Sequence, residues 1–229
     1  MDNRNWTDLT TAADVCAAYP AWVEKLFAAL DPDNADLAAA HGAWAAGDRV
    51  TACQKLLGHY AGRGAGWRLG EGERSMENVE SSLADTFTFQ NVTATVPRLP
   101  DGHLDWMHRG PNDDVEFCCF LNRHHFTRNL LGAWKDTRKP EYAAAVDRLI
   151  RDWITAMGGQ YPGAKAGALT PWRGLEVSFQ VKNWVPAFFE QDGKKPLLSD
   201  ATRLLVLCTL VDHADYARRF HAGGNWLTM

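Results

Sequence analysis

The sequence predicts an all-α fold made of antiparallel helix pairs, arranged as a helical bundle or toroid. Apolar residues recur at helical spacing through most of the 229 residues, and short segments containing Gly and Pro separate these stretches. Only residues 86–96 alternate polar and apolar side chains as a strand does. A chain of this length can bury about 70% of its unfolded surface, so it can build a core without disulfides or metals.

Residues 1–61 are expected to form small helical hairpins. Apolar residues fall on one helical face through 11–30, and Pro20 interrupts the pattern, which predicts a break or kink at that point. Two further helices are predicted, near 34–46 and over 49–61, with a glycine–aspartate pair between them.

Residues 62–115 differ in composition, because Gly, Pro, Asn and Asp are frequent. We expect a long loop excursion with little regular structure, and such a loop inside a compact domain is usually functional or mobile. Residues 116–229 return to helical periodicity and are expected to form the main helical pairs of a single domain that spans the chain. These helices are predicted over 116–134, 140–157, 172–190 and 199–221.

The charge of the chain argues against nucleic acid as a partner. The net charge is −4 and the pI is near 6.0, whereas nucleic-acid-binding proteins usually carry a basic surface. An acidic ligand stays compatible, because a groove can be locally basic on an acidic protein. No apolar stretch approaches the length of a membrane span, and the first residues do not resemble a signal peptide.

No metal site or cofactor is predicted. The cysteines are scattered, odd in number and without a CxxC pair, so they are interpreted as buried thiols. They are Cys16, Cys53, Cys118, Cys119 and Cys208. A metal is also conceivable near Asp212, His213, Asp215 and His221. This group lacks a convincing third ligand on an otherwise apolar helix, so a solvated helix end is favoured.

Five segments, taken in order, resemble the N-terminal domain of the heparinase II/III family of polysaccharide lyases. They are residues 42–63, LNRHHF (121–126), 132–154, 171–189 and GGNWLTM (223–229). The resemblance implies an incomplete (α/α) toroid, followed in full-length members by an antiparallel β-sandwich. It also implies an acidic polysaccharide substrate, similar to heparin, heparan sulfate or alginate, and a periplasmic or secreted location.

Lyases of this type cleave a glycosidic bond by β-elimination on a uronic acid. A base removes the proton from C5, and the leaving oxygen departs from C4. Negative charge then builds on the carboxylate, so catalysis needs donors that neutralise that group, together with an acid and a base. An Asn amide suits the first role, because it offers two N–H donors and no charge of its own.

Asn225 is the candidate catalytic residue. The resemblance places it in the turn where the family carries a carboxylate-neutralising Asn, and two preceding glycines would allow a close approach of the backbone. The alternative role is an N-cap of a following helix. Trp226 stands where many members carry a His, so no His role is transferred, and Trp226 is kept as a candidate substrate contact.

Arg123 and His124 are candidate substrate-binding residues, because a guanidinium can bind a carboxylate or sulfate through two parallel hydrogen bonds. The alternatives are an ion pair between Arg123 and a carboxylate such as Glu116, and a partly buried, hydrogen-bonded His124. Trp172 and Arg173 are candidates as well. Trp172 could stack on a sugar or plug the toroid.

Glu176 is the last substrate-binding candidate. It lies one helical turn after Arg173 and could orient that side chain toward a groove, or the two could form a surface pair of little energetic value. The terminal GGNWLTM is interpreted as a truncation. The resemblance then implies that the catalytic Tyr and a second His lie beyond this chain, which alone should be inactive or nearly so.

Two other classes of function remain open from the sequence. A glycoside hydrolase would need two carboxylates that face each other, and the sequence does not identify such a pair among the carboxylates available. The available carboxylates are Asp105, Asp113, Asp114, Glu116 and Glu176. A non-catalytic carbohydrate-binding or interaction module is the second alternative.

Overall fold

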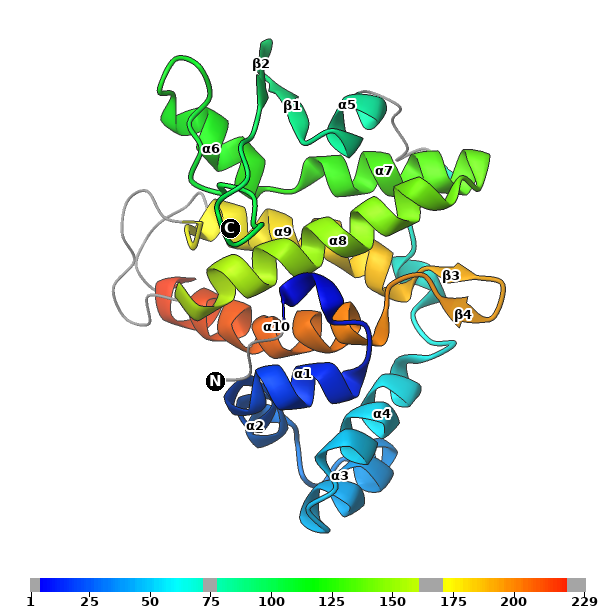
Figure 1. Ribbon diagram of the computed structural model, residues 1–229. Helices are drawn as coiled ribbons and strands as arrows, with labels where there is room; N and C mark the ends of the chain where they lie inside the picture. The colour runs from blue at the N-terminus through cyan, green and yellow to red at the C-terminus, as the bar shows by residue number, and fades with distance from the viewer. Residues whose placement is uncertain (1–4, 72–77, 161–170, 222–229) are drawn as a thin grey trace.

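The computed structural model describes residues 5–71, 78–160 and 171–221, and this part of the chain is predominantly helical (Figure 1). The helices are α1 (Ala12–Ala18), α2 (Pro20–Ala29), α3 (Ala38–Ala45), α4 (Arg49–Tyr60), α5 (Val79–Leu83), α6 (Val115–Asn122), α7 (His125–Thr137), α8 (Pro140–Met157), α9 (Gly174–Phe189) and α10 (Asp200–His221). Two antiparallel hairpins are β1 (Thr86–Phe89) with β2 (Val92–Thr95), and β3 (Gln191–Asp192) with β4 (Lys195–Pro196). The all-α prediction is therefore confirmed for the described residues.

Helix α10 runs through the middle of the domain and packs against α9, α8, α2 and α1 (Figure 1). Helix α7 lies antiparallel to α8 and also packs against α9, while α3 and α4 form a hairpin at one end. The largest fully buried side chains include Trp106, Trp153, Trp172 and Trp184. None of the described helices is long and apolar enough to span a membrane.

Local sequence signals explain the first helices. Thr11 and Asp14 form a capping box that starts α1, since each side chain accepts a backbone N–H of the other. Pro20 occupies the first turn of α2, where its missing N–H costs nothing, so the predicted break at this residue is confirmed. Asp48 caps α4 by accepting the N–H of Thr51 at 3.0 Å.

One predicted helix is wrong in extent. The stretch 116–134 is two helices, α6 and α7, separated at Arg123 and His124. His124 has a left-handed backbone with φ of 59° and Thr127 donates its hydroxyl to the His124 carbonyl at 2.8 Å. The apolar pattern continues through the junction because both helices bury one face in the same core, so periodicity alone does not reveal the break.

The region 62–115 is more ordered than the sequence predicted. Within its described part it contains α5 and the β1–β2 hairpin, so the strand-like pattern of 86–96 is confirmed. Gln90 and Asn91 both have positive φ, as a tight two-residue hairpin turn requires.

Buried Asp152 of α8 holds the loop that follows the hairpin. It accepts hydrogen bonds from the His103 ring, the Leu104 backbone N–H and the Trp106 indole at 2.9 to 3.3 Å. Arg98 lies 3.4 Å from the same carboxylate. Four donors from one loop therefore converge on a single buried carboxylate, which explains how a long connection keeps one conformation.

Candidate functional site

A buried carboxylate and two arginines form the centre of the site. Glu176, in the first turn of α9, is 1% exposed and accepts from Arg123 Nε at 3.1 Å. Arg173, just before the helix, donates to both Glu176 oxygens at 2.6 and 2.8 Å and keeps 30% of its side chain exposed. Glu116 lies 3.6 Å from Arg123 on the outer side and is 48% exposed. Glu176 therefore orients both guanidinium groups.

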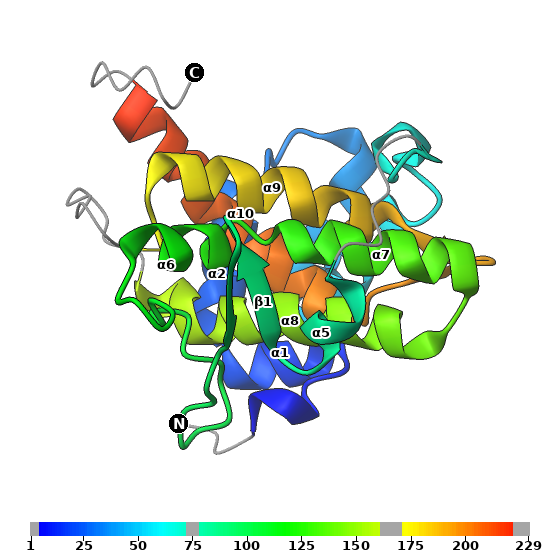
Figure 2. The same ribbon diagram turned by 90° about the horizontal axis from the view of Figure 1, so that it is seen from above.

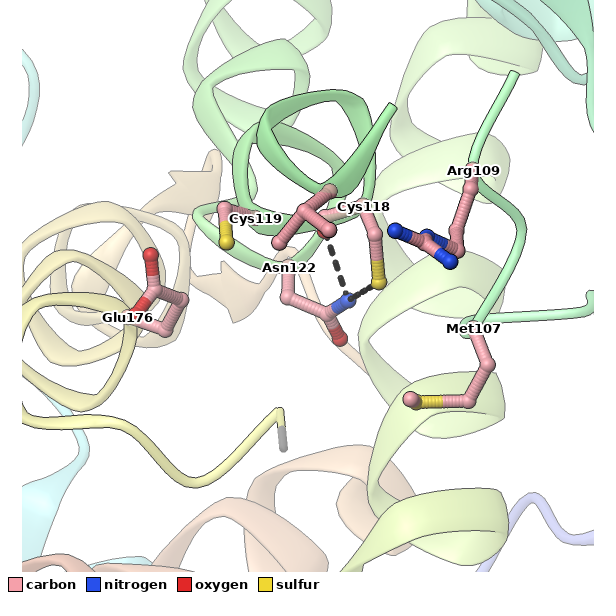
Figure 3. A pocket seen from close by; sticks show the side chains of 7 residues that line it. Met107, Arg109, Cys118, Cys119, Asn122 and Glu176 are labelled. Carbon is pink, nitrogen blue, oxygen red and sulfur yellow. Dashed lines mark hydrogen bonds between the residues drawn. The ribbon is translucent and has the colours of Figure 1, made fainter. Parts of the chain in front are cut away.

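A pocket of about 180 Å³ adjoins this cluster (Figure 3). Side chains of α6, of α9 and of the preceding loop surround it: Met107, Arg109, Val115, Cys118, Cys119, Asn122 and Glu176. Burial raises the pKa of Cys118 to about 11 and also raises the pKa of Cys119, so both remain neutral thiols at pH 7. All five cysteines are free thiols, and Cys118 and Cys119 are poor nucleophiles. Cys53, Cys119 and Cys208 are buried as predicted, whereas Cys16 and Cys118 are only partly buried.

The side chain of His124 points into the protein interior. Its ring is completely buried, stacks on Trp106 at 5.0 Å and accepts the Trp184 indole N–H at Nδ1. The proposed substrate contact therefore finds no support in the geometry, and the buried-ring alternative describes it better. Its left-handed backbone and this indole bond explain the placement, because together they turn the ring inward at the α6–α7 junction. Nε2 has no partner within the described residues.

Two buried histidines should make stability depend on pH. Burial lowers the pKa of His124 well below 6.5, and burial lowers the pKa of His213 to about 4. Between these values and 6.5 the unfolded chain binds more protons than the folded one, so stability is lost as the pH falls below about 6.5. Each histidine contributes up to about 1.4 kcal/mol per pH unit. Urea unfolding of His124→Asn between pH 7 and 5 should show a shallower loss than the unmodified chain; equal slopes would contradict this assignment.

Trp172 is a core residue. It is fully buried, donates from its indole to the Met157 carbonyl at 3.0 Å and packs against Trp153 and His213. Stacking of Trp172 on a sugar is therefore excluded, because none of its surface is exposed and α8 and α10 pack against the ring. The alternative of a plug in the interior agrees with the structure.

Trp172→Phe should separate these two roles. Loss of the indole bond to the Met157 carbonyl, together with the volume lost when indole is replaced by phenyl, should lower the free energy of unfolding by about 1–3 kcal/mol. Retention of the folded variant on an immobilised acidic polysaccharide should be unchanged. A large loss of retention without a loss of stability would restore Trp172 as a ligand contact.

The C-terminal turns of α10 approach the arginine cluster. Tyr216 is buried, and its hydroxyl accepts a hydrogen bond from the backbone of Gly174, which directly follows Arg173. Burial raises the pKa of Tyr216, so this tyrosine is neutral and structural. Asn225 and Trp226 lie outside the described residues.

Comparisons with known proteins identify the family. The family model described as "Heparinase II/III N-terminus" matches residues 26–229. The chain belongs to the heparinase II/III family. The predicted family is thereby confirmed, and the match covers most of the chain. A comparison with curated proteins gave no match.

A solved structure shares the fold of this heparinase II/III domain. It is the crystal structure of heparan sulfate lyase HepC from Pedobacter heparinus, with a TM-score of 0.64 and 21% sequence identity. The alignment covers 85% of this chain and 32% of that chain. The chain thus spans about a third of the length of this lyase.

Part of the arginine cluster could be predicted from the sequence. The Arg173–Glu176 pair and the Arg123–Glu116 contact were both among the alternatives that the sequence offered, because their residues are close in sequence, and both contacts are present. The bond between Arg123 and Glu176 was missed, since 53 positions separate them. No local pattern signals such a pair.

Three of the carboxylates considered for a glycoside hydrolase form local hydrogen bonds or ion pairs. Asp114 caps α6 at Glu116 N, Asp113 pairs with Arg109, and Asp105 accepts the Met107 N–H. Within the described residues no group of His, Cys, Asp and Glu could hold a metal ion. Asp212 instead pairs with Lys25 at 2.6 Å.

Proposed function

We propose that this chain is the helical domain of a lyase that cleaves a uronic-acid-containing polysaccharide by β-elimination. The observation that carries the proposal is its membership of the heparinase II/III family. The similar solved protein is by name a heparan sulfate lyase, which favours an acidic polymer as the ligand. We further propose that the antiparallel pairs α7–α8 and α9–α10 are part of an incomplete (α/α) toroid.

The arginine cluster supports binding of a polyanion. Arg173 is the more open of the two guanidinium groups and is assigned the contact with a carboxylate or sulfate of the ligand. Arg123 is mostly buried and stacks over the Phe120 ring at 4.2 Å. It therefore acts mainly as a positioning residue, and Glu176 holds both arginines. His124 and Trp172 are not included, for the reasons given above.

Asn225 is assigned the neutralisation of the uronate carboxylate. In the reaction a base takes the C5 proton, the electron pair forms the C4–C5 double bond, and the C4–O bond breaks as an acid protonates the leaving oxygen. Charge on the carboxylate grows as the proton leaves, so amide donors at that group stabilise the transition state. Trp226 is proposed as a neighbouring substrate contact. The acid and the base are not assigned to residues of this chain.

The experiment compares two products in one reaction. The complete open reading frame containing this chain, and the chain alone, are incubated with heparan-type, alginate and other uronate polymers. A lyase produces ultraviolet absorbance from the new C4–C5 double bond together with new reducing ends. Reducing ends without absorbance would indicate a hydrolase and overturn the proposal. Retention on the polymer without either product from the complete frame would indicate a binding module.

A further inference from the structure

An exposed tryptophan stands apart from the other aromatic residues. Trp67 ends a short 3-10 helical turn, Ala65–Trp67, and is 65% exposed. The other tryptophans of the described residues are buried or half-buried. A large aromatic ring left in water gains nothing for folding, whereas an open ring face is suited to stack on a ligand.

The turn that carries Trp67 is fixed in place. Gly64 has a φ of +70°, and a Cβ at this position would lie 2.3 Å from the Phe189 ring, so only glycine fits there. Arg68 donates from Nε to the Phe189 carbonyl at 2.9 Å. These two contacts anchor both sides of the turn to the end of α9. Trp67 is thus presented by a rigid support.

A basic pocket of about 280 Å³ lies beside this ring. Cations from three separate segments line it: Arg68 after the turn, Arg128 of α7 and Lys182 of α9. The remaining lining residues are Gly66, Trp67, Val181, Val185 and Pro186, so among the residues that the structure describes no carboxylate lines the pocket. On a chain with a net charge of −4, such a grouping is a local excess of positive charge that favours an anion.

The pocket lies near the arginine cluster. Helices α7 and α9 lie side by side (Figure 2). The His125 ring of α7 contacts the Phe179 ring of α9 at a centroid distance of 4.8 Å. Arg123 Cζ and Lys182 Nζ each lie 5.9 Å from the centroid of this Phe179 ring, so a cation of each site lies beside it. A chain of several sugar units could therefore contact both sites.

We propose that Trp67, Arg68 and Lys182 form a second sugar subsite, which binds an acidic unit of the same polysaccharide at a distance from the arginine cluster. The indole face stacks on the sugar ring, and the cations bind its carboxylate or sulfate group. Pro186 removes the N–H that would otherwise bond the Lys182 carbonyl, so this acceptor is available to a sugar hydroxyl. The inference rests on the proposed function, because it assumes the same polymer.

The test measures affinity as a function of ligand length. Calorimetry uses uronate oligosaccharides of defined size, a disaccharide and an octasaccharide, each with and without sulfate. Trp67→Ala and Lys182→Gln should each weaken octasaccharide binding, Trp67→Ala by about tenfold, and should leave disaccharide binding unchanged. Trp67→Phe should retain most of the affinity. Lys55→Gln, an exposed cation on α4, is the matched control and should have no effect.

The outcomes separate this inference from the proposed function. If the unmodified chain binds the octasaccharide and Trp67→Ala binds it equally well, the second subsite is overturned while the proposed function stands. If the unmodified chain binds no uronate oligosaccharide, the proposed function is contradicted, and the second subsite is contradicted with it. A larger effect on sulfated than on unsulfated ligands would assign the cations to sulfate, and an equal effect would assign them to the carboxylate.

Discussion

Replacing Glu176 with alanine is expected to lower the free energy of unfolding by about 3–5 kcal/mol. The carboxylate is almost completely buried and accepts from both Arg123 and Arg173. Its removal leaves the mostly buried Arg123 guanidinium without its closest partner, and an uncompensated buried charge is strongly destabilising. Urea denaturation followed by circular dichroism measures the change directly.

Glu116→Ala is the matched control, because Glu116 also contacts Arg123. Its carboxylate lies 3.6 Å from the guanidinium and is half exposed, so its loss should cost no more than about 1 kcal/mol. The loss in the free energy of unfolding for Glu176→Gln should lie between the losses for these two variants, since the amide keeps the volume of the side chain and one acceptor oxygen. Equal destabilisation by Glu116→Ala and Glu176→Ala would contradict the central position of Glu176.

Asn225→Ala should reduce kcat for a uronate polymer by about 10²–10³-fold in the complete open reading frame, the usual effect of losing one donor that stabilises a developing oxyanion. KM should change much less, because the interaction strengthens only as the C5 proton leaves. Initial rates of absorbance from the unsaturated product provide both constants.

Asn225→Asp distinguishes neutralisation from helix capping. Aspartate is as good an N-cap as asparagine, but it has no N–H donor and adds a negative charge beside the uronate. If Asn225 neutralises the carboxylate, the aspartate variant should be at least as impaired as the alanine variant and remain as stable as the unmodified protein. Recovery of activity by aspartate would assign the residue to capping alone.

The helices were predictable where the chain carries its own signals. The periodicity of α8, the break at Pro20 and the alternation in β1 and β2 are local properties of the sequence. The α6–α7 junction was not predictable, since its left-handed His124 is stabilised by tertiary contacts with Trp106 and Trp184.

The candidate site also contains some contacts that the local sequence predicts and others that depend on tertiary packing. Arg173 and Glu176 are neighbours on one helical turn, so their pairing could be read from spacing. The burial of His124 and Trp172 depends on how α7, α8, α9 and α10 pack, which the sequence does not encode locally. Trp67 was not singled out, because nothing near it in the sequence indicates that α7 and α9 bring Arg128 and Lys182 beside it.

Binding of the chain alone to a uronate polymer and to its carboxyl-reduced form is the most direct measurement. The two polymers share one backbone and differ only in the groups that the arginines are proposed to bind. We predict binding to the native polymer that weakens as salt is added, and a loss of at least about tenfold in affinity on reduction of the carboxyl groups. Equal affinity for both polymers, or none for either, would contradict recognition of uronate by this domain.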